Sequence, residues 1–112
     1  MLNKIKAHAI ENIADKFAEY CERYAISRHA LPYYEQEYNA ILEAFESKAE
    51  DIQSTTSEEL EAVTLGDIDE VFQICEDARN EFDNAIDEAI EELSVLFNRD
   101  NTEMIQLYYF ND

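Results

Sequence analysis

Apolar residues recur every three or four positions along most of the chain, which is the period of an amphipathic helix. The first such stretch predicts a helix over residues 2–24. Its apolar positions form a single stripe: Ile5, Ala9, Ile13, Phe17, Cys21 and Tyr24. A second stretch begins at Pro32, which suits the first turn of a helix because its missing N–H needs no partner there. It predicts a helix over residues 32–52, with these core positions: Tyr34, Tyr38, Ile41, Leu42, Phe45, Ala49 and Ile52.

The second half of the chain contains a short and a long periodic stretch. Polar residues at 53–57 predict a break, and Thr56 with Glu59 matches a capping box that opens a short helix over 57–63. Gly66, the only glycine, predicts a turn. Asp67 then caps a long helix over 67–97. The apolar stripe of this helix continues for about eight turns: Ile68, Val71, Phe72, Cys75, Ala78, Phe82, Ile86, Ala89, Ile90, Leu93 and Leu96.

These segments predict an all-α fold, a small helical bundle with one long acidic helix in its C-terminal half. One Gly and one Pro leave few of the turn residues that a sheet needs. Seven Tyr and six Phe supply enough aromatic surface for a packed core. We therefore expect a single acidic domain over residues 1–112. The aromatic segment 102–110 is expected to pack back on that core or on a second chain.

The charge of the chain is strongly negative and unevenly distributed. There are 27 acidic and 8 basic residues, for a net charge of −19. Residues 1–56 carry −4 of that charge and residues 57–112 carry −15. Solubility of a small domain needs a net charge of only about 2–8 in magnitude. A field of this sign repels nucleic acid and anionic membranes and attracts basic grooves. It predicts a basic nucleic-acid-binding protein as partner, and neither nucleic acid nor membrane.

The long helix concentrates this charge. Residues 67–92 hold 11 acids and one base, Arg79, or one carboxylate per ~3.5 Å of helix axis. One strand of duplex DNA carries a phosphate every ~3.4 Å. Eight acids fall on the side of the helix opposite its apolar stripe: Asp69, Glu70, Glu76, Asp77, Glu81, Asp87, Glu88 and Glu91. This face is interpreted either as a partner-binding imitation of a phosphate backbone or as a solvated surface.

The sequence predicts no enzyme, cofactor or metal site. His8 and His29 do not lie at metal-binding spacings with Cys or acidic residues, and a single glycine cannot form a phosphate-binding loop. Cys21 and Cys75 lie on apolar stripes and are expected to be buried, reduced thiols. No run of ~18 apolar residues predicts a membrane span, and the N-terminus lacks a signal-peptide pattern. These patterns favour a cytoplasmic location, in the host cell if the protein is phage-encoded.

Residues 30–37 resemble a short motif of the Ocr-type phage antirestriction proteins. Ala30, Leu31 and Pro32, followed by Tyr34 and Glu37, match that motif. The order of a first helix, the motif and a long acidic helix is also similar. The resemblance implies an all-helical dimer that mimics bent duplex DNA and occupies restriction enzymes.

Charge and resemblance together favour a DNA-mimic inhibitor of a host defence protein, a restriction or CRISPR effector, acting by electrostatic competition. The alternative is an acidic helical adaptor, or interaction protein, that binds its partner through the aromatic C-terminus. Salt separates the two interpretations, because screening weakens the first kind of contact and barely affects the second.

We expect the protein to form a homodimer through residues 104–110. The apolar side chains of this segment are exposed unless another surface covers them: Ile105, Leu107, Tyr108, Tyr109 and Phe110. Light scattering at micromolar concentration should give twice the chain mass of 13.1 kDa. A monomer mass would contradict the dimer and favour packing of the segment on its own core.

Overall fold

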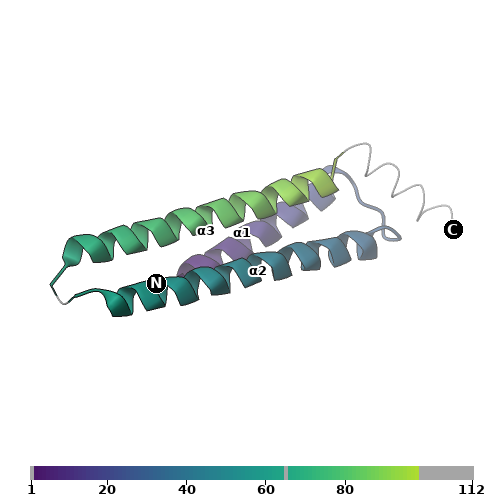
Figure 1. Cartoon of the computed structure of the whole chain (residues 1–112). Helices are drawn as coiled ribbons and strands as arrows, with labels where there is room; N and C mark the ends of the chain where they lie inside the picture. The colour runs from purple at the N-terminus through teal and green to yellow at the C-terminus, as the bar shows by residue number, and fades with distance from the viewer. Residues whose placement is uncertain (1, 65, 99–112) are drawn as a thin grey trace.

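The computed structural model describes residues 2–64 and 66–98, which form three helices (Figure 1). Helix α1 covers Leu2–Arg23, α2 covers Leu31–Ala62 and α3 covers Ile68–Leu96. All regular secondary structure in the described residues is helical, which confirms the predicted all-α bundle. Helix α2 runs antiparallel to both α1 and α3, which run in the same direction, in an elongated body of 65 × 19 × 18 Å.

Helix α1 ends in a turn that leads directly into α2. The N–H of Ile26 donates to the carbonyl of Cys21 at 3.1 Å, and that of Ala25 donates to Glu22 at 3.2 Å. These bonds satisfy carbonyls that the end of a helix leaves free, and they place Ala25 in the left-handed region at φ 48°. The Ser27 hydroxyl accepts a hydrogen bond from the N–H of Ala30 at 3.2 Å, just before α2 begins.

The turn between α2 and α3 follows the sequence prediction. Gly66 adopts φ 96°, a conformation that costs glycine little because it has no Cβ. The Asp67 carboxylate accepts a hydrogen bond from the N–H of Glu70 at 3.2 Å and so caps α3. Both the predicted turn and the predicted cap are confirmed.

The predicted break at residues 53–57 is wrong, because α2 continues through it to Ala62. Thr56 is therefore no N-cap. It is 5 % exposed and lies one turn after Ile52 on the buried side of α2. Ser and Thr are only mildly unfavourable inside a helix, so burial of this face keeps the helix intact. The residues predicted as a separate helix over 57–63 form the end of α2.

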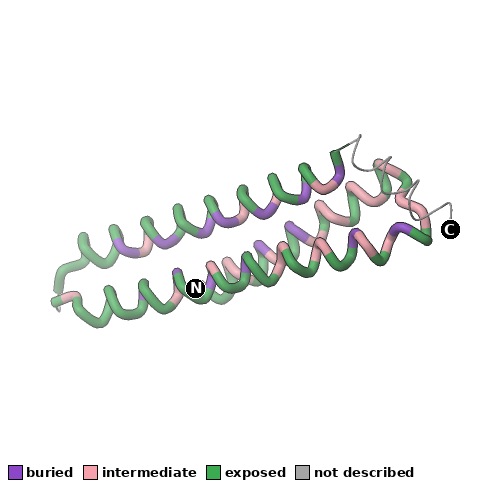
Figure 2. The backbone as a smooth tube through the Cα atoms, turned by 45° about the vertical axis from the view of Figure 1, so that its right-hand side comes forward, coloured by how far each residue is buried: buried purple, intermediate pink, exposed green. Residues whose placement is uncertain are grey.

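The core runs along the facing sides of the three helices (Figure 2). The stripes predicted for α1 and α2 are confirmed, since each predicted position is buried or packs against the core. Phe97, just after α3, joins all three elements at one end. Its ring centroid lies 4.8 Å from that of Tyr34, 5.4 Å from Tyr20, 5.7 Å from Phe17 and 6.2 Å from Tyr24.

The stripe predicted for α3 is wrong over its first turns. Ile68 is 64 % exposed, Phe72 is 69 % exposed and Val71 is also exposed. The buried residues of α3 include two that the stripe missed, Ile74 and Ala85.

The exposure of these turns follows from the length of α1. With 22 residues, α1 is shorter than its neighbours, and its start lies beside the last third of α2. There the side chain of Gln53 donates to that of Asn3 at 2.7 Å. Beyond this point α2 and α3 continue as a two-helix projection, residues 57–64 and 66–72, which we call the hairpin tip.

The two cysteines are free thiols, as predicted, but they are half-buried rather than buried. Burial raises the pKa of the Cys21 thiol, and the negative charge of Glu35 raises it further. The predicted C-terminal packing segment 102–110 lies outside the described residues, as do the dimer contacts expected within it.

Two phenylalanines of α3 separate core packing from surface exposure. Phe82 has no exposed surface, whereas Phe72 is mostly exposed. We expect Phe82→Ala to lower the free energy of unfolding by about 3–5 kcal/mol, because it removes a fully buried ring and leaves a cavity. Phe72→Ala should change it by no more than about 0.5 kcal/mol. Chemical denaturation followed by circular dichroism measures both, and equal losses would contradict this account of the core.

Candidate partner-binding surface on α3

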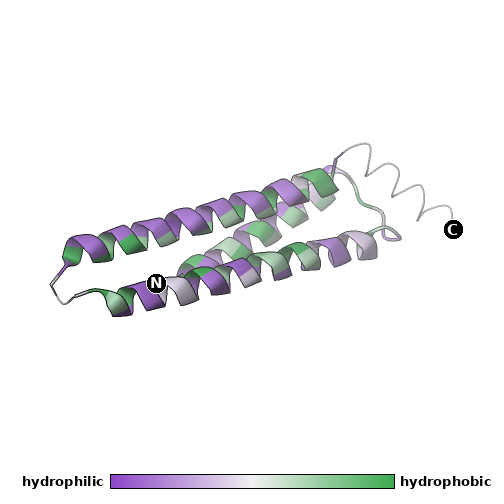
Figure 3. Cartoon of the chain, in the orientation of Figure 1, coloured by the Kyte–Doolittle hydropathy of each residue, from purple (hydrophilic) through white to green (hydrophobic). Residues whose placement is uncertain are grey.

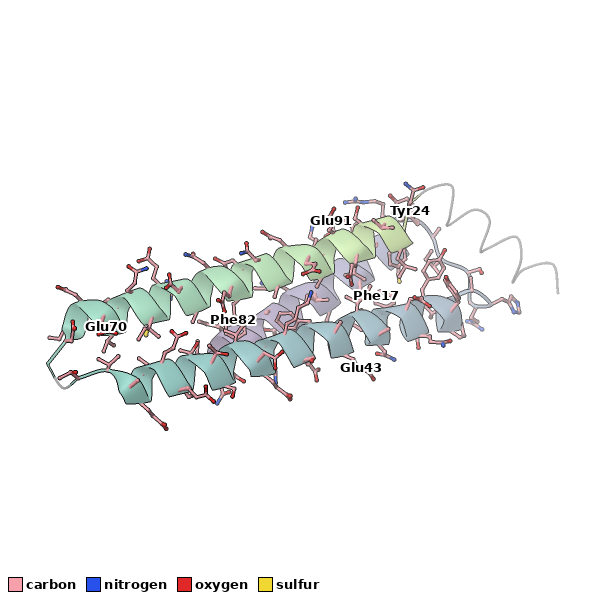
Figure 4. All side chains as sticks on the ribbon, viewed as in Figure 1. Phe17, Tyr24, Glu43, Glu70, Phe82 and Glu91 are labelled. Carbon is pink, nitrogen blue, oxygen red and sulfur yellow. The ribbon has the colours of Figure 1, made fainter. Side chains whose placement is uncertain are left out.

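All eight acids of the predicted binding face are exposed. Asp77, Glu81 and Glu88 lie along the flank of α3 that is next to α2. The surface of α3 away from the core is strongly hydrophilic (Figure 3). Glu70 and Glu91 mark the two ends of the row (Figure 4). From Asp69 to Glu91 the row extends ~33 Å along the helix axis.

One acid of this face is paired with a base. The Lys48 ammonium of α2 forms an ion pair with the Glu88 carboxylate, and both side chains are about half exposed. Asp77 accepts a hydrogen bond from the side chain of Gln73 at 2.9 Å, which orients the carboxylate without neutralising it. Within the described residues, no base forms an ion pair with the other seven acids of the face.

Helix α2 contributes acids that sequence reasoning missed. Glu59 lines a shallow hollow of about 290 Å³ together with Asp77 and Glu81. Asp51 lines a second hollow, of about 300 Å³, together with Glu81, Glu88 and Lys48. We call these five carboxylates, which follow the line where α2 meets α3, the acidic seam: Asp51, Glu59, Asp77, Glu81 and Glu88.

Glu59 was assigned to the seam only by the structure because the sequence placed it at the start of a separate helix. In that predicted helix the Glu59 side chain would reach back to the backbone N–H of the N-cap residue Thr56, so nothing related Glu59 to α3. A signal was present, since Ile52, Thr56 and Glu59 recur at the three- and four-residue spacing of one helix face. A continuous α2 brings Glu59 beside α3 and widens the acidic surface by one helix.

The acids of α1 have a different environment. Glu19 lies between two bases, 2.7 Å from the Arg23 guanidinium and 3.5 Å from the Lys16 ammonium. Glu11 lies 3.8 Å from the ring of His8. The charge of α1 is thus largely balanced by its own bases, whereas the charge of α3 is not. Helices α2 and α3 together carry 19 acids and two bases, Lys48 and Arg79. The negative field of the molecule therefore comes from these two helices and not from α1.

The geometry suits long-range electrostatic attraction. The carboxylates line open hollows and an exposed helix face, where water and ions reach them. Among the described residues, no three His, Cys, Asp or Glu side chains are grouped so as to hold a metal ion. None of the helices in residues 2–64 and 66–98 combines the length and the apolar character that a membrane span requires.

Comparison of the chain with protein-family models, with curated proteins and with solved structures found no match.

Repulsion within α3 gives a stability prediction. Asp87 lies four residues from both Asp83 and Glu91, and such acid pairs on a helix are mutually destabilising. Asp87→Lys turns both repulsions into attractions and should raise the free energy of unfolding by about 1 kcal/mol. The gain should shrink as salt screens the charges, and denaturation at low and high ionic strength measures it.

The matched control is Glu35→Lys, which makes the same charge change of +2 at an exposed position of α2 without an acid three or four residues away. Its effect should be smaller than that of Asp87→Lys. An equal gain from both would show that net charge, and not the local row on α3, sets the stability.

Proposed function

We propose that the protein is a DNA-mimic inhibitor that occupies the nucleic-acid-binding groove of a basic protein. The observation that carries the proposal is the row of eight exposed acids along α3, of which one pairs with a described base. A protein that needed acids only for solubility would gain stability from bases interleaved along the same face. The bases of α1 are placed in that way, and those of α3 are not.

The dimensions of the row support imitation of a phosphate backbone. Its length of ~33 Å is close to one turn of B-DNA, which is ~34–36 Å. Counting all 11 acids of residues 67–92, the carboxylate spacing is ~3.5 Å along the helix axis, close to the ~3.4 Å phosphate spacing of one strand. The acidic seam adds charge on the α2 side, so the surface offers carboxylates across two helices.

A groove built for nucleic acid is a suitable target for such a surface. Phosphate contacts position a nucleic acid and carry no base identity, so a rod of carboxylates needs no sequence to engage them. We propose a host defence protein as the target, such as a restriction or CRISPR effector. The Ocr-type resemblance of Ala30, Leu31, Pro32, Tyr34 and Glu37 supports this class of target.

Two multiple variants test the acidic face on a partner identified from a bacterial lysate by pull-down at low salt. The first replaces six face acids with Asn or Gln: Asp69, Glu70, Asp77, Asp87, Glu88 and Glu91. It should lower the affinity about 100-fold or more, mainly through the association rate, because steering depends on the summed field. Asp87→Asn alone should cost little, since single exposed charges contribute about 0–1 kcal/mol.

The matched control replaces six exposed acids elsewhere: Glu11, Asp15, Glu19, Glu22, Glu43 and Glu46. It removes the same formal charge and should cost less, because part of that charge is already balanced on α1. Surface plasmon resonance gives both rates, and circular dichroism checks helicity. Equal losses would show that charge acts globally, and no loss from either would mean that the acids are a solvated surface.

Duplex DNA should displace the protein from the same partner, because both would occupy the same groove. The free protein should not shift a duplex probe. Binding that does not weaken with rising salt would favour the second candidate function, an adaptor that uses the aromatic residues 105–110.

A further inference from the structure

The hairpin tip exposes a cluster of apolar side chains. Leu60, Ile68, Val71 and Phe72 are all exposed, and Phe72 is the most exposed large apolar side chain of the described residues. With Val63 they line a hollow of about 280 Å³. Contiguous exposed apolar surface of this kind marks an interaction site more often than scattered single residues do.

The hollow at the tip continues toward the start of α1. A second hollow, of about 410 Å³, is lined by Leu2 and Asn3 of α1, by Gln53 and Leu60 of α2, and by Cys75 of α3. Leu60 lines both hollows. We call the two together the tip groove. It begins where α1 begins and ends at the turn between α2 and α3.

The tip groove lies where α1 would pack if α1 began earlier. Helix α1 packs against both α2 and α3, and its start lies well short of the turn between α2 and α3 (Figure 1). The groove is lined by Leu2 and Asn3 at the start of α1 and by residues of α2 and α3 beyond it. From Gln53 to Val63 it measures ~15 Å along α2, which matches about three turns of helix. An amphipathic helix that lays apolar side chains at i, i+3, i+4 and i+7 into such a groove is a recurrent mode of recognition.

The charge around the groove determines what kind of helix it fits. Residues 49–78 contain ten acids and no Lys, Arg or His. Of these acids Asp67 lines the groove itself, and five others are exposed elsewhere on the hairpin tip: Glu58, Glu59, Glu61, Asp69 and Glu70. We call the six together the acidic rim of the tip. A second copy of this chain would bring two such rims together, and juxtaposed like charges oppose association. A basic helix would meet the rim with opposite charge.

We propose that the tip groove binds an amphipathic basic helix of a partner protein, with Ile68 and Phe72 as the principal apolar contacts and the acidic rim on its Lys and Arg side chains. This site goes beyond the electrostatic competition proposed for α3. It uses the end of the bundle that α1 leaves uncovered, and its apolar part is insensitive to salt.

Binding of synthetic peptides tests the site without knowledge of the natural partner. The probe is a fluorescent helical peptide of Leu and Lys, with Leu at the i, i+3, i+4 and i+7 spacing. The control peptide carries the same Lys residues and Gln in place of Leu. At a salt concentration of about 0.5 M, where exposed charges are largely screened, the full chain should bind the Leu peptide at least about tenfold more tightly, as expected when buried anchor residues carry the affinity.

The double variant Ile68→Ser with Phe72→Ser should lose that tenfold advantage and bind both peptides alike. The matched control is Val95→Ser, which removes an apolar side chain of similar exposure, 61 %, from the opposite end of α3. It should bind like the original chain. Circular dichroism should show the same helicity for all three proteins, since each change removes an exposed side chain.

Equal binding of the Leu peptide by the original chain and the double variant would overturn the proposal. So would a dimer in light scattering that the double variant converts to monomer, because a second copy would then occupy the groove. Failure of the α3 proposal is a separate outcome, since it appears in the salt-dependent loss caused by the six-acid variant and does not involve the Leu peptide.

Discussion

The ring of Phe97 is the contact on which the arrangement of the bundle depends. It is fully buried and packs against Phe17, Tyr20 and Tyr24 at the end of α1 and against Tyr34 at the start of α2. Burying one phenylalanine contributes about 1.5–3 kcal/mol, and each favourable ring pair adds about 0.5–1.5 kcal/mol. An acid pair on a helix face opposes folding by about 0.2–0.5 kcal/mol. Aromatic packing at one end therefore outweighs several repulsive pairs elsewhere, and a net charge of −19 is compatible with a folded chain.

This anchoring makes the two ends of the molecule different. At the Phe97 end all three helices meet, and the bases of α1 balance its acids. Toward the hairpin tip α1 has not yet begun, so α2 and α3 lose its apolar cover. The open groove thus follows from the short length of α1 relative to its neighbours, whereas the negative field follows from the acids of α2 and α3 themselves.

The helical period was sufficient to predict the fold class, the stripes of α1 and α2, the turn at Gly66 and the cap at Asp67. It failed at two places where a local signal depends on a distant partner. Thr56 is both a good N-cap and a tolerable interior residue, and burial beside Ile52 decided for the latter. Ile68 and Phe72 have the spacing of core residues, but the helix that would cover them is absent at their level.

The candidate surface was predictable in the same partial way. The exposure of the α3 acids follows from their position opposite the apolar stripe, and all eight are exposed. Their relation to α2 does not follow from α3 alone. Pairing of Glu88 with Lys48, and the approach of Glu59 to Asp77, depend on the register between two helices that are separated by a turn. No periodicity within one segment encodes that register.

The two proposed surfaces have different physical roles, and they share the start of α3. Asp69 and Glu70 belong both to the acidic row and to the hairpin tip, whereas Phe72, only two residues later, lines the tip groove and supplies apolar contact. Charges at long range raise the rate of encounter, and buried apolar anchors mainly lower the rate of dissociation. A carboxylate row alone would bind many basic grooves and would be displaced readily by salt. An apolar contact at one end of the row would restrict binding to basic partners that also present an amphipathic helix, because those that lack it would gain only the screened part of the interaction. If the row imitates a phosphate backbone, as proposed, it fits the phosphate contacts of any protein that binds nucleic acid, so selectivity has to come from a contact of this apolar kind.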